Sequence, residues 1–296
     1  MNISRNSGFN RGFSYSSLII PMSIISNSDS RLSNLVFLKL GGSLITDKNQ
    51  PYTLRPHKLE QLANEIAEAY RQNPALQLIL GHGAGSFAHT PAKIYGTRQG
   101  VHTPEQWRGF AEVWWQAARL NHYVMEALHK AGLPGVALPP SAGVTAQDGQ
   151  LLTWDLNPIK STLSAGLLPV IFGDVIFDTV RGGTIFSTED LFDHLARNLQ
   201  PKQILLAGIE TGVWADYPHC HELLSEITPA SYAQIRLSVS GSTATDVTGG
   251  MASKVQQSLN LVQEIPGLQV MIFSGEQAGN ITKALAGETL GTRIKT

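Results

Sequence analysis

The sequence predicts an α/β fold in which helices cover both faces of an open, mostly parallel sheet. Two observations predict it. After residue 35, short apolar runs alternate with amphipathic segments, and a glycine-rich turn follows each of the first two runs. This alternation is typical of parallel sheets, whose neighbouring strands need a crossover helix between them. The 296 residues are enough for one such domain. We therefore expect a single domain over residues 35–296.

The expected strands are the short apolar runs at residues 35–38, 78–80, 136–138, 168–172, 203–207 and 268–273. The expected helices have apolar side chains at helical spacing, over residues 59–70, 104–130, 191–199 and 249–264. The longest begins at Thr103-Pro104, which suit the N-cap and first helical positions, and ends at Gly132. Ligands of such sheets bind beyond the carboxyl ends of the strands, so we expect the site there.

Residues 1–34 differ in composition from the rest of the chain. They are rich in Ser, Asn and Arg and contain one acidic residue, Asp29. A transit peptide has a similar composition, but the apolar patch at residues 18–21 is short for one. We interpret the segment as a disordered N-terminal extension, or as the product of a start codon placed upstream of Met22. It lacks the apolar content that offsets the entropy of ordering, so we expect it to be dispensable.

The charge composition excludes several kinds of partner. Charged residues make up 15% of the chain, and 22 basic residues against 23 acidic ones give a net charge of −1. This balance predicts no surface for nucleic acid or for an anionic membrane. No apolar run reaches the roughly 18 residues of a membrane span. The single cysteine, Cys220, excludes an intramolecular disulfide and favours a reducing, cytoplasmic compartment. Small anionic ligands still fit, because a few lysines can gather within a neutral total.

The most informative segment is the glycine-rich turn at residues 82–89, which follows an expected strand. Its glycines let the backbone turn tightly and approach a ligand. Successive N–H groups placed before a helix suit an anion. We interpret His89, which closes the turn, as a donor to a bound phosphate. We interpret His82, which directly follows the strand, as structural.

A second glycine turn, Lys39–Ser43, also follows an expected strand. Lys39 can reach phosphate oxygens held by the N–H groups of this turn. Lys48 lies nine residues further on, and Lys254 follows a Gly-Gly turn that opens a helix. Moving a phosphoryl group between two anions requires positive charge and alignment, with little covalent help from the protein. The lysines fit that demand, and the two turns predict a site for two phosphorylated ligands.

Carboxylates follow strands of the expected sheet as well. Asp174 directly follows the strand at 168–172, where it can orient the lysines through charge-assisted hydrogen bonds or cap its own loop. Residues 187–190 suit a capping box at the start of a helix. His219 and His221 flank Cys220, but neighbours in sequence do not easily chelate one ion, so no metal ligand is assigned there. The tryptophans and Phe110 of the long helix are expected to be mostly core, with one edge free to line an apolar pocket.

Together these motifs resemble the amino acid kinase superfamily, and within it the isopentenyl phosphate kinase family. The resemblance covers residues 35–294. The turn Lys39–Ser43 is similar to the first nucleotide-phosphate motif of the family. The turn at 82–89 is similar to its substrate-phosphate loop, whose closing histidine separates this branch from the glutamate, aspartate and uridylate kinases. Gly173–Val175 and the segment 246–254 complete the pattern.

The resemblance implies the amino acid kinase fold, a three-layer αβα sandwich with a mostly parallel open sheet. It implies ATP-dependent phosphorylation of isopentenyl phosphate to isopentenyl diphosphate, with Mg²⁺, by a homodimer. The catalytic residues that it implies are Lys48, His89, Lys39, Lys254 and Asp174. The residues that it implies for ATP are Lys39, Gly41, Gly42, Ser43, Gly85, Gly208, Gly212, Gly249, Gly250 and Lys254, with the adenine near residues 207–214. Those that it implies for the substrate phosphate are Gly83, Ala84, Gly85, His89 and Gly173.

Two positions depart from the pattern of the family, and two other functions remain open. Ala88 stands where glycine is usual, and Ser187-Thr188-Glu189 stands where Ser-Gly-Asp is common. Glutamate keeps the charge but is longer by one methylene, which leaves the role of Glu189 open. One alternative is a kinase of the same branch that acts on a small phosphonate of the fosfomycin type. The other is a non-catalytic nucleotide sensor with this fold, against which the three lysines argue.

Overall fold

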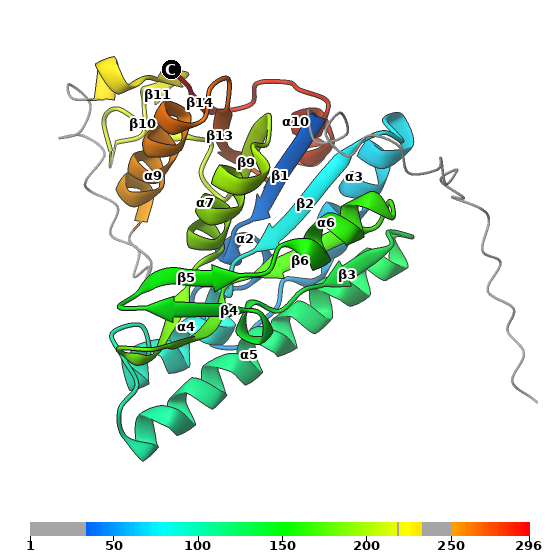
Figure 1. The fold of residues 1–296 in the computed structure, drawn as a ribbon. Helices are drawn as coiled ribbons and strands as arrows, with labels where there is room; N and C mark the ends of the chain where they lie inside the picture. The colour runs from blue at the N-terminus through cyan, green and yellow to red at the C-terminus, as the bar shows by residue number, and fades with distance from the viewer. Residues whose placement is uncertain (1–33, 218, 233–249) are drawn as a thin grey trace, which may run out of the picture.

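The computed structural model describes residues 34–217, 219–232 and 250–296. The predicted extension therefore lies, apart from Asn34, outside the described residues. The largest feature is a sheet of eight strands in the order β12-β14-β13-β9-β1-β2-β6-β3 (Figure 1). Only the β13–β14 pair in this sheet is antiparallel. Its strands are β1 (Leu35–Leu40), β2 (Gln77–His82), β3 (Gly135–Ala137), β6 (Leu168–Phe172), β9 (Gln203–Gly208), β12 (Glu226–Ile227), β13 (Gln269–Ser274) and β14 (Thr292–Ile294).

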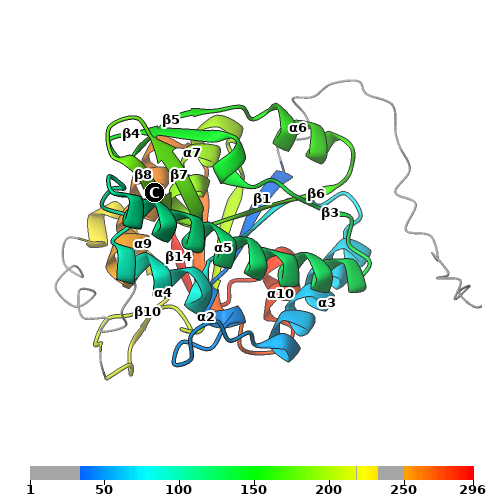
Figure 2. The same cartoon turned by 90° about the horizontal axis from the view of Figure 1, so that it is seen from below.

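Helices cover both faces of this sheet, which gives the three layers that the sequence predicts (Figure 2). Side chains of β1 alternate between the faces, as in any strand buried on both sides. Leu35 and Phe37 join the core under α7 and α9, whereas Leu38 and Leu40 join the core under α3 and α5. The helices are α2 (Gly42–Ile45), α3 (Pro56–Gln72), α4 (Gly85–Tyr95), α5 (Pro104–Lys130), α6 (Asn157–Ser164), α7 (Thr188–Leu199), α9 (Gly250–Glu264) and α10 (Asn280–Leu285).

A smaller sheet in the order β5-β4-β7-β8 continues from the carboxyl end of β6. Asp178, at the end of β7, accepts hydrogen bonds from the backbone N–H groups of Gly149 and Arg181, which joins the two hairpin turns of this sheet. The strands of the smaller sheets are β4 (Val144–Gln147), β5 (Gln150–Trp154), β7 (Asp174–Asp178), β8 (Gly182–Phe186), β10 (Val213–Trp214) and β11 (Leu223–Leu224). The sequence reading did not predict them.

The predicted strands and helices of the main layers are confirmed, with ends that differ by a few residues. Helix α5 begins as expected, because Thr103 and Gln106 form a capping box. The prediction for its tryptophans is wrong. Trp107, Trp114 and Trp115 are 37%, 43% and 57% exposed, because the buried face of α5 is occupied by Phe110 and its helical neighbours. In the part of the chain that the structure describes, no helix is long and apolar enough to span a membrane.

Candidate active site

The two glycine turns meet, backbone against backbone, beyond the carboxyl ends of β1 and β2. The N–H of Gly83 donates to the carbonyl of Leu40 at 2.9 Å. A Cβ atom on Gly42 would lie 2.6 Å from the Cα of Gly85, and one on Gly83 would lie 2.7 Å from the nitrogen of Gly42. Real Cβ atoms essentially never come so close, so the approach requires glycine. The structure thus brings together the two turns that the sequence assigned to two phosphates.

Thr46 connects the two turns through its side chain. Its Oγ1 donates to the carbonyl of Gly42 at 2.8 Å and accepts from the N–H of Ser86 at 3.0 Å. The threonine is 1% exposed. Gly85 fits beside it only as glycine, because its φ is +52° and a Cβ would lie 2.8 Å from Cγ2 of Thr46. The sequence reading missed this residue, whose signal is a hydroxyl four residues after a turn glycine.

Helix α4 begins within the second turn, at Gly85, with Ala84 as its N-cap residue. His89 therefore lies one helical turn inside α4, where the sequence reading placed it at the close of the turn. Its side chain is half-buried. The N–H groups of the first helical turn lack carbonyl partners within a helix and carry positive partial charge, so this end of α4 favours an anion.

Lys39 and Glu189 form a buried ion pair at the end of β1. Their side chains are each 10% exposed. Burial alone would raise the pKa of Glu189, but the positive charges of Lys39 and Lys254 outweigh burial and lower it. Glu189 is therefore an ionised carboxylate between two lysines. It lies in the first turn of α7, behind the capping box that Ser187 and Asp190 form.

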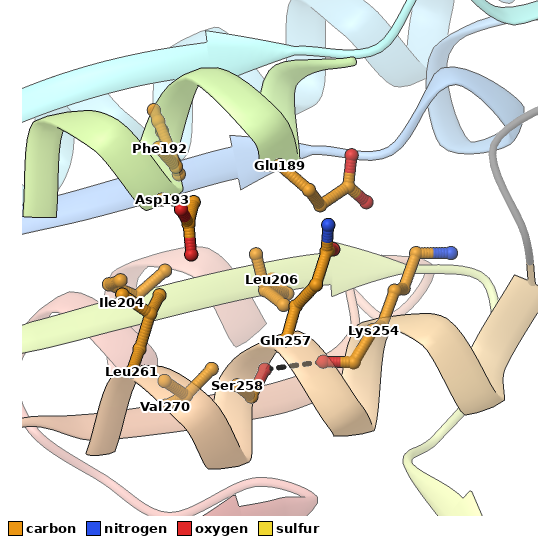
Figure 3. Close-up of a pocket in the computed structure, with 10 residues that line it drawn as sticks. All are labelled: Glu189, Phe192, Asp193, Ile204, Leu206, Lys254, Gln257, Ser258, Leu261 and Val270. Atoms are coloured by element: carbon orange, nitrogen blue, oxygen red, sulfur yellow. Dashed lines mark hydrogen bonds between the residues drawn. The ribbon is translucent and has the colours of Figure 1, made fainter. Parts of the chain in front are cut away.

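Lys254 comes from α9, which packs beside α7. Figure 3 shows Glu189 of α7 with Lys254 and Gln257 of α9 at one end of a pocket between the two helices. The other end is lined by Phe192, Ile204 and Leu261, together with the carboxylate of Asp193. Glu189 and Lys254 thus approach each other from α7 and α9 at one end of this pocket.

Lys48 lies in the exposed loop that follows α2. The loop is closed by the N–H of Asp47, which donates to the carbonyl of Thr53 at 2.9 Å. Tyr52 joins it to α4, because its ring packs edge-on against Phe87 with centroids 6.4 Å apart. The loop that carries Lys48 therefore lies beside the second glycine turn. That its ammonium reaches the phosphates expected at the two glycine turns stays a prediction.

Asp174 is buried at the start of β7. Its carboxylate accepts hydrogen bonds from the N–H groups of Ser141, at 3.2 Å, and Val175, at 2.9 Å. Burial raises its pKa to about 6. Val175 is a neighbour in its own loop, whereas Ser141 belongs to the turn Pro140–Ala142, 33 positions away. A carboxylate that pairs with Lys39 is that of Glu189. That Asp174 orients the lysines stays a prediction.

The end of β9 lies against the first glycine turn. The N–H of Gly41 donates to the carbonyl of Ala207, and the carbonyl of Gly208 accepts from the N–H of Gly275, both at 2.8 Å. Gly212 lies further along this segment, packed against Thr292. Gly41 and Gly208 therefore lie at the first turn, where the sequence predicts ATP, and Gly212 lies beside β14.

Three further sequence predictions concern the surroundings of these turns. His82 is fully buried, stacks on Phe172 and lies 3.2 Å from Asn121 Oδ1, as expected of a structural histidine. Gly173 lies beside it, since its N–H donates to the carbonyl of His82 at 3.3 Å. Gly250 begins α9 with a φ of +69°, whereas Gly249 and the preceding residues of the motif lie outside the described residues.

The profile of the amino acid kinase family matches residues 34–274. The isopentenyl phosphate kinase of Methanocaldococcus jannaschii is 35% identical over 269 residues, which are 88% of this chain and 98% of that protein. The chain belongs to the amino acid kinase family, in its isopentenyl phosphate kinase branch. The isopentenyl phosphate kinase of Arabidopsis thaliana is more distant, with 26% identity over 92% of this chain and 98% of its own length.

Solved structures agree with this membership of the amino acid kinase family. One described as an isopentenyl phosphate kinase superposes with a TM-score of 0.74 at 32% sequence identity, over 88% of this chain and 100% of the other. The predicted fold is thereby confirmed. Within the site, the structure adds the ion pair of Lys39 with Glu189.

Proposed function

We propose that the protein is an isopentenyl phosphate kinase that transfers the γ-phosphoryl group of ATP to isopentenyl phosphate, giving isopentenyl diphosphate and ADP. The observation that carries this proposal is the backbone contact between Gly42 and the turn of Gly83 and Gly85. This contact supports two neighbouring anion sites, as transfer between two phosphates requires. The names of relatives at 35% identity support the choice of acceptor.

In this proposal the first glycine turn binds ATP and the second binds the acceptor. An oxygen of the acceptor phosphate attacks the γ-phosphorus, and the bond from the γ-phosphorus to the bridging oxygen breaks. Charge spreads over the equatorial oxygens of the migrating group. Lys39, Lys254 and Lys48 stabilise that charge, while His89 and the N-terminal end of α4 hold the acceptor phosphate.

Glu189 acts through Lys39. A lysine side chain has several rotatable bonds, and a fixed ammonium stabilises developing charge better than a mobile one. The buried carboxylate of Glu189 holds the Lys39 ammonium at the end of β1. We assign to Glu189 the task of orienting this lysine, and we propose that Asp174 helps to orient the lysines as well.

Mg²⁺ is the proposed cofactor. The described residues contain no group of three or more His, Cys, Asp or Glu side chains that could hold a metal ion. Mg²⁺ does not need such a group of ligands, because in kinases it is bound mainly by substrate phosphates and keeps several waters. Glu189, ionised between the lysines, is the side chain that would bind one of these waters. When bound, the ion neutralises charge on the β- and γ-phosphates.

We also propose that the protein is a cytoplasmic homodimer. Ile94 of α4 and Trp114 and Trp115 of α5 are exposed apolar side chains, which support an interface that involves these helices. Light scattering of the purified protein measures the oligomeric state, and a monomer at micromolar concentration would contradict the proposal.

A coupled assay of ADP release tests the proposed reaction. The purified protein is given ATP and Mg²⁺ with isopentenyl phosphate or with fosfomycin, and mass spectrometry identifies the product. We expect isopentenyl diphosphate and a kcat/KM for isopentenyl phosphate well above that for the phosphonate. Preference for fosfomycin would identify the phosphonate kinase instead. ATP binding without turnover of either acceptor would identify the nucleotide sensor.

A further inference from the structure

Asp190, the residue after Glu189, joins three elements around the site. Its Oδ2 accepts from Arg98 Nη2 at 3.1 Å and from the N–H of Ser187 at 2.8 Å. Its Oδ1 accepts from Gln257 Nε2 at 3.2 Å. One carboxylate therefore connects the segment after α4, the start of α7 and the middle of α9.

Each of these elements carries a residue of the proposed reaction. Arg98 follows α4, the helix of His89, by three residues. Asp190 is adjacent to Glu189, which holds Lys39. Gln257 lies three residues after Lys254, on the same face of α9, and Figure 3 shows both side chains at the same end of the pocket. Asp190 thus lies between the acceptor side and the donor side of the site.

Asp190 and the segment that carries Arg98 are each held in place by further hydrogen bonds. The capping box holds Asp190, because its own N–H donates to Ser187 Oγ at 3.1 Å. The segment of Arg98 is held to β8, since Thr184 Oγ1 donates to the carbonyl of Arg98 at 3.0 Å. Among the described residues, Asp190 is the one carboxylate that forms an ion pair with Arg98. A shift of α4 relative to α9 would therefore break bonds to Asp190.

We propose that Asp190 is a positioning residue that aligns the acceptor phosphate on α4 with the lysines of β1 and α9. This rests on the proposed kinase function. Asp190 contributes through Arg98 and Gln257. In-line transfer depends steeply on alignment, and a misplacement of about 1 Å can cost roughly a hundredfold in rate. Loss of the connection therefore lowers the rate of transfer more than it lowers the affinity for either substrate.

The test uses the variants Arg98→Gln and Gln257→Leu, singly and combined, in the full chain. Each single variant is expected to lower kcat roughly tenfold or more, since a misplacement of about 1 Å can cost up to roughly a hundredfold. Calorimetric dissociation constants for ATP and for isopentenyl phosphate should change less than about threefold, since each phosphate site stays intact. The kcat of the double variant should be little lower than that of the less active single variant, because both substitutions break the same connection. Arg98→Lys should recover part of kcat.

Arg197→Gln is the matched control. Arg197 also joins α7 to α9, through Glu264 at 2.7 Å, but at the other end of the two helices. It should lower the melting temperature without lowering kcat. If the wild type is active and both single variants keep its kcat, the proposed role of Asp190 is wrong. The role is also wrong if the losses of kcat in the two single variants multiply in the double variant. A wild type inactive on isopentenyl phosphate would overturn the proposed function itself. If Arg98→Gln does not fold, Gln257→Leu and Arg98→Lys decide the question in the same way.

Discussion

Replacing Gly42 by alanine tests whether contact between the two glycine turns sets the rate of phosphoryl transfer. A Cβ at this position would lie 2.6 Å from the Cα of Gly85, whereas ordinary van der Waals contact begins at 3.4 Å. The two backbones must therefore part by about 1 Å, because the backbone nitrogen of Gly85 lies nearer still and neither atom belongs to a flexible side chain. The φ of Gly42 lies outside the left-handed region, so alanine meets no conformational strain there. The expected effect is a displacement of one phosphate site from the other.

A displacement of this size is expected to lower kcat/KM roughly a hundredfold. That factor corresponds to about 2.7 kcal/mol of lost transition-state stabilisation. Steady-state kinetics with ATP and isopentenyl phosphate measure it, and thermal unfolding shows whether the variant folds. Gly143→Ala is the control, since a Cβ there would find its nearest atoms on Trp154 at 3.8 Å, which is an ordinary contact. A folded Gly42→Ala protein with activity within threefold of wild type would refute the reasoning.

The remaining predictions concern single groups and the N-terminal segment. Lys48→Ala should lower kcat roughly a hundredfold while ATP affinity changes much less, since a contact made mainly in the transition state does not tighten the ground state; equal losses would place Lys48 on bound ATP. His89→Ala should lower kcat/KM for isopentenyl phosphate at least about tenfold and leave ATP binding unchanged, as a hydrogen bond to a charged group is worth about 1.5–3 kcal/mol; calorimetry that shows weaker ATP binding and normal isopentenyl phosphate binding would mean that the two turns are assigned to the wrong ligands. A chain that begins at Ser33 should keep its melting temperature and turnover, and loss of either would show that the extension docks on the domain. Burial raises the pKa of Asp174 from 3.8 to about 6, so its contribution to stability is full below the lower value and is lost as pH rises through the higher one; Asp174→Asn should flatten the melting temperature between these values, and an unchanged slope would contradict the shift.

The sequence predicts those helices and strands whose signals, apolar periodicity and turn glycines, lie within a few neighbouring residues. The apolar run of β6 and the Thr103-Pro104 start of α5 are predictable because each signal lies within a few residues. Helix α4 was missed because it begins with glycine and contains Pro91, both of which weaken a helical pattern. The small sheet was missed because Gly182 and Gly183 occupy the start of β8, where glycine is disfavoured.

The sequence predicts the two glycine turns of the candidate site, but not the side-chain contacts between residues that are distant in sequence. Lys39 and the turn glycines follow from residue type and position. The partner of Lys39 does not, because Glu189 is 150 positions away and the two meet only through the packing of α7 on the sheet. Thr46 was missed for a related reason. Its hydroxyl matters because it lies between two turns that are distant in sequence.

The contact between the glycine turns separates two properties that many enzymes vary together. Gly42 meets Gly85 through backbone atoms, so peptide geometry, supported by the buried Thr46, sets the spacing between the two proposed phosphate sites. Substitutions elsewhere can then reshape the room available to the organic part of the acceptor without altering that spacing. A lineage with this backbone can exchange one phosphorylated acceptor for another while its transfer chemistry stays constant.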